Sequence, residues 1–156
     1  MKLHTQSVVV CLLFASVCVA AADQHHPPAA GAMGFDQDQT THHFRLLSTG
    51  GSINVDVKDR ADHATLHAIH THLQAIAADF STGVFDKPLI THGQVPPGAA
   101  TMRALKDRLE YVFEPTETGG RVRISTRDAE ALAAVHEFLR YQIREHRTGD
   151  PLTVER

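Results

Sequence analysis

Histidine is the residue type that most strongly suggests chemistry in this chain. The 156 residues include 12 histidines, and most of them fall in clusters. Imidazole is the commonest protein metal ligand and titrates near neutral pH, so the enrichment predicts metal binding or proton handling. The clusters are His25-His26, His42-His43, and His63, His67, His70 and His72.

Three of these histidines have helical spacing. His63, His67 and His70 follow an i, i+4, i+7 pattern, so a helix would carry them on one flank, where neighbouring pairs could chelate an ion. The segment is not a His-Glu-x-x-His protease helix, because Ala64 occupies the position of the general base. His72 projects from the opposite flank. The alternative is a solvated face with weak, adventitious metal affinity.

The pair His42-His43 opens a predicted strand. Neighbouring strand residues point to opposite faces of a sheet, so only one of the pair faces the helices. Imidazoles with the upstream thioether of Met33 would suit Cu(I), whereas imidazoles with the carboxylates of Asp36 and Asp38 would suit Zn(II) or Cu(II). Ordinary surface packing is the alternative for both histidines.

An internal repeat predicts the elements that must position these side chains. Residues 49–55 match 118–124, with Thr-Gly-Gly at the start of each, and 68–73 match 134–139. Each unit has the pattern of strand, Gly-Gly turn, strand and helix, with strands at 43–47, 53–57, 109–113 and 122–126. The two units span about 41–83 and 109–149.

Apolar residues at 3,4 spacing predict one helix in each unit. They are Leu66, Ile69, Leu73, Ile76 and Phe80 in the first helix, and Leu132, Val135, Leu139 and Ile143, followed by His146, in the second. The candidate N-terminal caps are Asp59 or Asp62 for the first helix and Asp128 for the second.

We therefore predict an α+β fold of two ββα repeats. They would form a four-stranded antiparallel sheet covered on one face by two helices, with pseudo-two-fold symmetry. An ordered loop (88–98) and a short helix (99–108) would join the units.

The repeat also sorts the remaining histidines. His70 and His136 occupy equivalent positions at the border of the apolar stripe, as candidate ligands or as side chains that hydrogen-bond a nearby carbonyl. His146 aligns with Phe80 in the repeat, so its side chain would lie either in the core or at the end of the second helix. His92 lies in the loop before Pro96, where ordered loops often supply binding residues.

The first 22 residues have the pattern of a cleavable secretory signal. Lys2 precedes an apolar run (7–19) that is too short to span a bilayer, and small residues follow at 20–22. We expect a flexible tether at 23–34, a single domain at 35–156, and a periplasmic or secreted protein without a membrane span. Both cysteines, Cys11 and Cys18, fall in the signal, which excludes disulfides and thiolate sites from the mature chain.

Cleavage after Ala22 would create a new terminus, Asp23-Gln24-His25. Its amine, two backbone amides and the His25 imidazole could form a square-planar site for Cu(II) or Ni(II). An inert tether is the alternative. The formal net charge of the whole chain is −3, which makes nucleic acid an improbable partner.

Several segments resemble a family of small exported bacterial proteins without an established function. They are Met33-Gly34-Phe35-Asp36, Thr41-His42-His43-Phe44, the strand at 119–124 and the segment at 134–150. The resemblance covers 33–154 and implies a periplasmic setting. It favours His42, His43, His72 and His136 as features of the family pattern, and it supplies no catalytic residues.

The leading hypothesis is a periplasmic protein that binds or handles a metal ion, with copper favoured and zinc or nickel next. The expected ligands are His42, His43, His70, His72 and His136, with a second tier of His25, His63, His67, His92 and Met33. The alternative is a non-enzymatic envelope interaction module whose histidines respond to pH, with an envelope protein as partner.

The third hypothesis is a metal-dependent hydrolase. It lacks an Asp or Glu at a diagnostic spacing, so a non-enzymatic role is favoured. Haem held by two axial histidines is the least favoured cofactor, and covalent haem attachment would need cysteines.

Overall fold

The structure is a computed structural model that describes residues 33–88 and 93–155. Outside the described residues lie the predicted signal peptide and most of the predicted tether, including His25 and His26. The loop residue His92 also lies outside them. The described chain begins with the short turn η1 (Gln37–Gln39). The first hairpin, β1 (Thr40–Leu47) and β2 (Gly50–Val57), is followed by the helix α2 (His63–Ser81). The next elements are the short helix α4 (Ala99–Ala104) and the turn η2 (Lys106–Arg108). The second hairpin follows, formed by β3 (Leu109–Pro115) and β4 (Gly119–Thr126), and the last element is the helix α5 (Ala129–Glu145).

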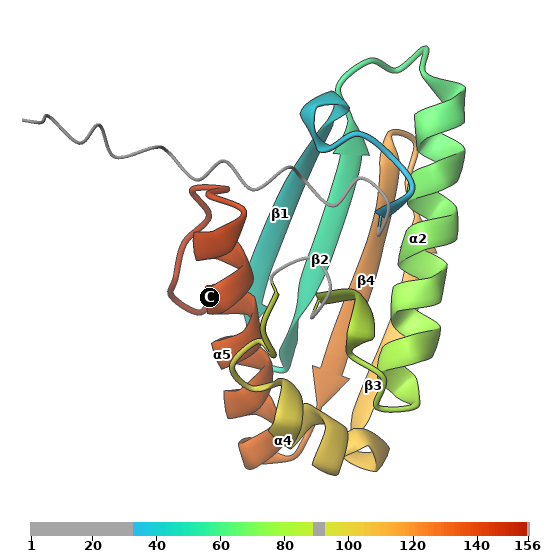
Figure 1. Cartoon of the computed structure of the whole chain (residues 1–156). Helices are drawn as coiled ribbons and strands as arrows, with labels where there is room; N and C mark the ends of the chain where they lie inside the picture. Colours follow the sequence, from blue (N-terminus) through green and yellow to red (C-terminus); the bar gives the residue numbers. More distant parts are fainter. Residues whose placement is uncertain (1–32, 89–92, 156) are drawn as a thin grey trace, which may run out of the picture.

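The four strands form one antiparallel sheet in the order β1-β2-β4-β3. The helices α2, α4 and α5 lie on the same face of this sheet (Figure 1). The predicted α+β fold, with a four-stranded antiparallel sheet and two long helices, is confirmed. The predicted extra helix at 99–108 is divided into α4 and η2.

The register of the sheet follows the internal repeat. Strand residues recur after 69 positions, as from Gly50 to Gly119, and Ile53 lies directly opposite its own counterpart, Val122. The pairing of Thr40 with Val57 in the first hairpin likewise recurs as the pairing of Leu109 with Thr126 in the second. An approximate two-fold axis therefore passes through the centre of the sheet, between β2 and β4.

Each helix packs mainly against the hairpin of the other unit. The helix α2 contacts β3 and β4, whereas α5 contacts β1 and β2 (Figure 1). Asp62 and Asp128 cap the two helices by accepting hydrogen bonds from backbone N–H groups of the first turn, as expected for these positions. The two units are thus interlocked around one hydrophobic core.

The glycine pairs begin β2 and β4, so the prediction that they form the hairpin turns is wrong. A Cβ atom on Gly50 would lie 2.0 Å from the Ile124 oxygen, and one on Gly119 would lie 1.9 Å from the Val55 oxygen. These oxygens are themselves repeat equivalents. The glycines are therefore required by the close approach of the two central strands at both ends of their contact.

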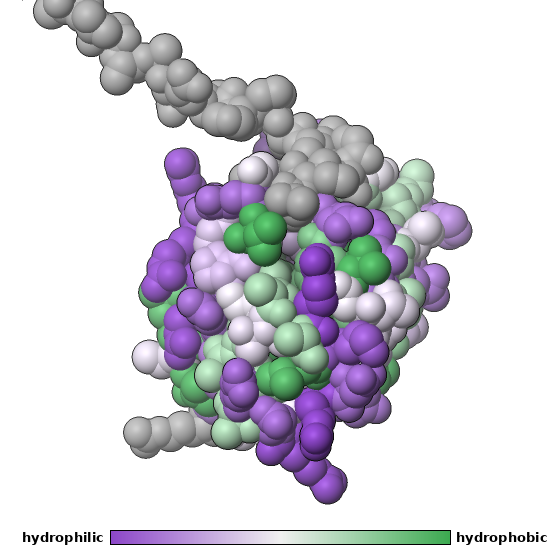
Figure 2. Space-filling model, turned by 60° about the horizontal axis from the view of Figure 1, so that its bottom comes forward, coloured by the Kyte–Doolittle hydropathy of each residue, from purple (hydrophilic) through white to green (hydrophobic). Residues whose placement is uncertain are grey.

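The core extends to the N-terminal end of the described chain. Met33, predicted to end the tether, and Phe35 are buried with the core residues of the helices and sheet. On the face turned forward in Figure 2, hydrophobic residues form separate patches among hydrophilic ones. Within residues 33–88 and 93–155, the structure contains no helix with the length and apolar character needed to span a membrane.

Candidate functional site

The alternation of β1 separates the two neighbouring histidines as predicted. His42 points to the helix side of the sheet with Phe44 and Leu46, and His43 points to the outer face with Arg45. His42 is half-buried and His43 is exposed. The two imidazoles therefore belong to different environments and cannot hold the same ion from one face.

His42 lines a cavity of about 60 Å³ between the sheet and the helices, together with two other histidines. His72 comes from α2, and His146 is the C-terminal cap of α5. The cavity is lined otherwise mainly by apolar side chains: Met33, Phe44, Ile53, Val55, Leu73, Ile76, Phe80, Pro88 and Phe138, with Lys87 and Gln142 as further polar residues. Three imidazoles from three elements thus meet one apolar cavity.

The rings around this cavity are in contact. The centroids of His42 and His146 are 5.3 Å apart with an interplanar angle of 21°. Phe35 lies between His42 and His72: its ring is 6.2 Å from His42 in a stacked arrangement and 5.6 Å from His72 at right angles. Phe35 therefore fixes the orientation of two of the three imidazoles.

Burial keeps two of these imidazoles uncharged. Burial lowers the pKa of His42 to about 4, with smaller contributions from nearby His72 and His43. Burial also lowers the pKa of His72 to about 4, where the positive charge of Lys87 adds to the effect and Asp79 opposes it. At neutral pH both rings are neutral, which is the form of imidazole that binds metal ions.

The internal repeat shows that the fold does not require histidine at these positions. The repeat equivalent of His42 is Tyr111, that of His72 is Phe138, and that of His146 is Phe80. Phe80 contacts both Tyr111 and Phe138, with ring centroids 5.7 and 5.8 Å apart. Of the two equivalent clusters, one therefore packs aromatic side chains and the other brings three imidazoles together.

His70 and His136 lie elsewhere and bond to main-chain oxygens. The Nε2 atom of His70 lies 2.7 Å from the Gly119 oxygen, and that of His136 lies 2.9 Å from the Leu47 oxygen and 3.1 Å from the Gly50 oxygen. Because a carbonyl accepts, each Nε2 must carry a proton and donate. The contacts are repeat equivalents that join each helix to the other unit's hairpin. They match the carbonyl-bonded alternative for this pair.

The predicted stripe along α2 is divided by the structure. His63 and His67 are exposed, whereas His70 turns toward the sheet. His72, on the other flank, is the α2 histidine that lines the cavity. Across the described ranges, no three His, Cys, Asp or Glu side chains are grouped so that they could hold one ion. The cavity thus offers no set of three such ligands.

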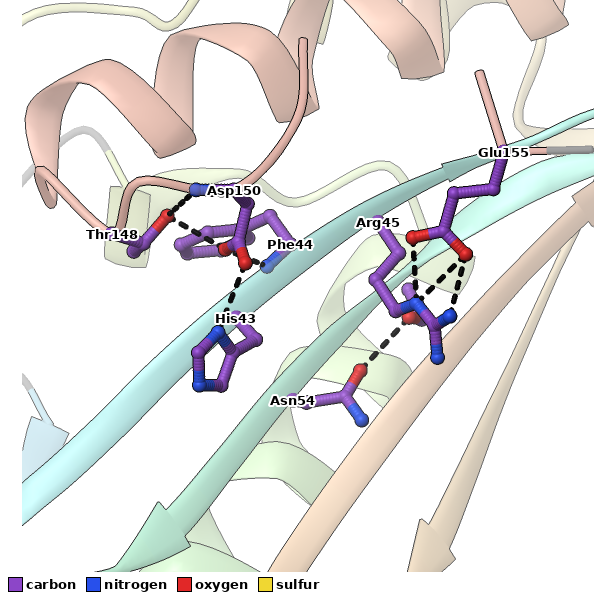
Figure 3. A network of polar contacts seen from close by, with 8 residues as sticks. His43, Phe44, Arg45, Asn54, Thr148, Asp150 and Glu155 are labelled. Carbon is purple, nitrogen blue, oxygen red and sulfur yellow. Dashed lines mark hydrogen bonds and ion pairs between the residues drawn. The ribbon is translucent and has the colours of Figure 1, made fainter. Parts of the chain in front are cut away.

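His43 takes part in a polar network on the other side of β1 (Figure 3). Its Nδ1 atom lies 2.9 Å from Asp150 Oδ1, while Asp150 Oδ2 accepts from the Phe44 N–H at 2.9 Å and from the Thr148 hydroxyl at 2.6 Å. Burial raises the pKa of Asp150, but the bonds from Thr148, Phe44 and His43 outweigh it and lower the pKa. This network attaches the C-terminal segment to β1.

A polar groove of about 330 Å³ lies outside the cavity. His42 and His146 line both the groove and the cavity, and Thr40, Thr41, His43 and Lys58 are among the other residues of the groove. The two stacked imidazoles therefore stand between a solvent-accessible polar surface and the apolar interior.

The sequence places His42 and His72 in one expected ligand set, and the structure brings both to the cavity. The sequence analysis does not predict that His146 joins them: it aligns His146 with Phe80 in the core or at the helix end, and the structure places it at the end of α5. Aligning all three positions with their aromatic counterparts in the repeat would have revealed the group.

Searches against known protein families, curated proteins and solved structures found no match to this chain.

Proposed function

We propose that this protein reversibly binds a metal ion, with copper as the preferred metal, at His42 and His146, with the Met33 thioether as a further donor and His72 as a neighbouring imidazole of the cavity wall and not a third histidine ligand. The observation that supports this most strongly is that three imidazoles form one of two equivalent clusters, where the other cluster packs aromatic side chains. Buried polar groups are costly unless they are satisfied, so an apolar cavity with three histidines needs a reason beyond packing.

The residues around the cavity favour a soft ion. Imidazoles and the Met33 thioether suit Cu(I). Among the described residues that line the cavity there is no carboxylate, and Asp38 lines the outer groove that shares His42 and His146. Structural zinc usually needs four tetrahedral ligands, which makes Zn(II) a weaker candidate for this site. The low pKa of His42 and His72 keeps protons from competing with the ion near neutral pH. The outer groove offers a route by which an ion would reach His42 and His146.

The proton-responsive alternative receives less support. A pKa of about 4 for His42 and His72 places their titration well below neutral pH, so these two rings would not change charge under ordinary conditions. A hydrolase would additionally need a general base beside the metal; the described residues of the cavity lining include no carboxylate, and Asp38 lines the outer groove instead. A periplasmic setting remains a proposal based on residues 1–22, which lie outside the described chain.

Titration of the purified protein with Cu(I) and Zn(II), each against a chromophoric competitor, tests the proposal. We expect one Cu(I) per chain, bound more tightly than Zn(II), and X-ray absorption that reports both nitrogen and sulfur neighbours. His146→Phe, which installs the side chain of the equivalent position, should weaken Cu(I) binding roughly 100-fold. The matched control His63→Ala removes an exposed imidazole and should leave the affinity unchanged. Equal losses in both variants, or no binding by the parent chain, would reject the site.

A further inference from the structure

The two edge strands of the sheet differ in how their outward backbone groups are satisfied. On β1, the Phe44 N–H donates to Asp150, and the Leu46 carbonyl accepts from the Glu155 N–H at 2.8 Å. Figure 3 shows the attachment of this segment through Asp150 and through the pair of Arg45 and Glu155. The C-terminal segment thus covers this edge of the sheet.

The equivalent groups of β3 point away from the sheet. Because β3 and β4 repeat the register of β1 and β2, Phe113 is the counterpart of Phe44. Tyr111 and Phe113 therefore direct their N–H and C=O groups outward, as Phe44 does on β1. Among the described residues, no group accepts a hydrogen bond from the N–H of Tyr111 or Phe113. An open edge of this kind is a template for pairing with another strand.

The side chains along β3 are also less covered than those of β1. Phe44 is only 3% exposed, whereas its counterpart Phe113 is half-buried, as are Leu109 and Tyr111 on the same side of the strand. These three side chains form a partly exposed apolar row that is continuous with the core. Pairing along β3 would bury this row as well as satisfy the backbone.

We propose that β3 pairs with β3 of a second copy of this chain, antiparallel and about a two-fold axis at Tyr111, to give a continuous eight-stranded sheet. Hydrogen bonding selects this register. An axis at Val112 would pair Leu109 with Pro115 of the second copy, and an axis at Phe113 would pair Tyr111 with Pro115, which has no N–H to donate. The axis at Val112 would also place Glu110 opposite Glu114, a pairing that is unfavourable to the extent that Arg121 and Arg123 do not neutralise Glu114.

The register about Tyr111 matches side chains on both faces of the sheet. It places Leu109 opposite Phe113 of the second copy on the helix side. Arg108, the last residue of η2, would then lie at the end of the paired stretch next to Glu114 of the second copy, which already accepts from Arg121 and Arg123 of its own chain. The outward N–H groups of Tyr111 and Phe113 would donate to Tyr111 and Leu109 of the second copy. Pro115, which lacks an N–H, falls outside the paired stretch.

Sedimentation of the purified protein over a range of concentrations tests this dimer, which does not depend on the metal proposal. We expect a reversible monomer–dimer equilibrium that is the same with and without Cu(I). Arg108→Glu would put two like-charged pairs across the interface and raise the dimer Kd about tenfold. The control Arg127→Glu makes the same charge change at an exposed position outside β3 and should have no effect. A monomer at every concentration, or equal effects of the two variants, would overturn the proposal.

Disulfide cross-linking tests the register separately, with Cys11 and Cys18 replaced by serine. Glu110 and Val112 of the second copy would be directly opposite on the outer face, so the double variant Glu110→Cys/Val112→Cys should cross-link on oxidation. Val112→Cys alone should remain uncross-linked. Cross-linking of the single variant would show the register about Val112 and overturn the one proposed.

Discussion

The two units of this protein share a backbone plan, and its approximate two-fold axis relates two side-chain clusters that differ in composition. In one cluster Phe80 packs against Tyr111 and Phe138, and in the other the equivalent positions are His146, His42 and His72. In contrast, the pair His70 and His136 is histidine in both units and makes the same kind of bond to a glycine carbonyl. The comparison separates histidines that the fold uses twice from histidines present in only one unit.

This difference identifies where chemistry has been added to a symmetrical scaffold. Residues that serve the fold are expected to recur in both units, because both interlocked halves face the same packing requirements. A group that breaks the symmetry with polar side chains in an apolar cavity has no such requirement behind it. The edges of the sheet differ in a similar way, since the C-terminal segment covers β1 and no described residue covers the outward N–H groups of β3.

The largest expected effect comes from the glycines shared by both units. Gly119→Ala would place a Cβ 1.9 Å from the Val55 oxygen, so the central strands must separate, and we expect a loss of roughly 3 kcal/mol or failure to fold. In Gly120→Ala the nearest atoms belong to the side chains of Phe113 and Leu73, which can move. Its loss should be smaller, about 1 kcal/mol. Urea unfolding of both variants measures the difference, and equal losses would show that backbone contact is not the cause.

The histidines of the first unit should make stability depend on pH. Their folded pKa of about 4 lies below the unfolded value of 6.5, so the unfolded chain binds more protons between these values. Stability is then fully present above about pH 6.5 and is lost as the pH falls toward 4, by about 3 kcal/mol for each ring. Unfolding at pH 7 and pH 4.5, without metal, should show this loss. It should nearly disappear in His42→Tyr/His72→Phe, and an unchanged pH dependence in that variant would contradict the burial argument.

The histidines shared by both units should contribute to stability unequally. His136→Leu removes the side-chain donor to the buried Gly50 oxygen and to the part-buried Leu47 oxygen, and we expect a loss of about 3 kcal/mol. His70→Leu removes one contact at a half-buried position and should cost about 1 kcal/mol. Neither change should alter the affinity for Cu(I). A loss of copper binding in either variant, with folding intact, would place these histidines in the metal site.

The smallest expected effect concerns the edges of the sheet. In the monomer, the Phe44 amide should exchange its hydrogen slowly and the Phe113 amide quickly, because only the first is bonded. Asp150→Ala should accelerate exchange at Phe44 with a loss of about 1 kcal/mol in stability. Exchange measured by NMR at low and high protein concentration checks both parts. Fast exchange at Phe44 in the parent chain would mean that the C-terminal segment does not hold β1.

Local sequence signals were sufficient for the fold because the repeat presented each of them twice. The spacing of Ile69 and Leu73 matched that of Val135 and Leu139, and capping by Asp62 and Asp128 followed from helix-start chemistry. The glycine pairs were assigned to turns because their requirement arises from the approach of β2 and β4, which are distant in sequence.

The candidate site was only partly predictable for the same reason. The opposite orientations of His42 and His43 followed from strand alternation. The meeting of His42 with His72 and His146 depends on how α2 and α5 cross the sheet, which periodicity alone does not specify. The repeat contained the missing information, because all three positions align with aromatic residues: Tyr111, Phe138 and Phe80.

The most direct test of the proposed metal site is to give the histidine cluster the side chains of its aromatic equivalent. The triple variant His42→Tyr/His72→Phe/His146→Phe carries the aromatic side chains that the equivalent positions already accommodate, so we expect it to fold. Cu(I) titration should then show stoichiometric binding by the parent chain and none by the triple variant. Retention of the parent affinity in the folded triple variant would contradict the proposal that these imidazoles hold the metal.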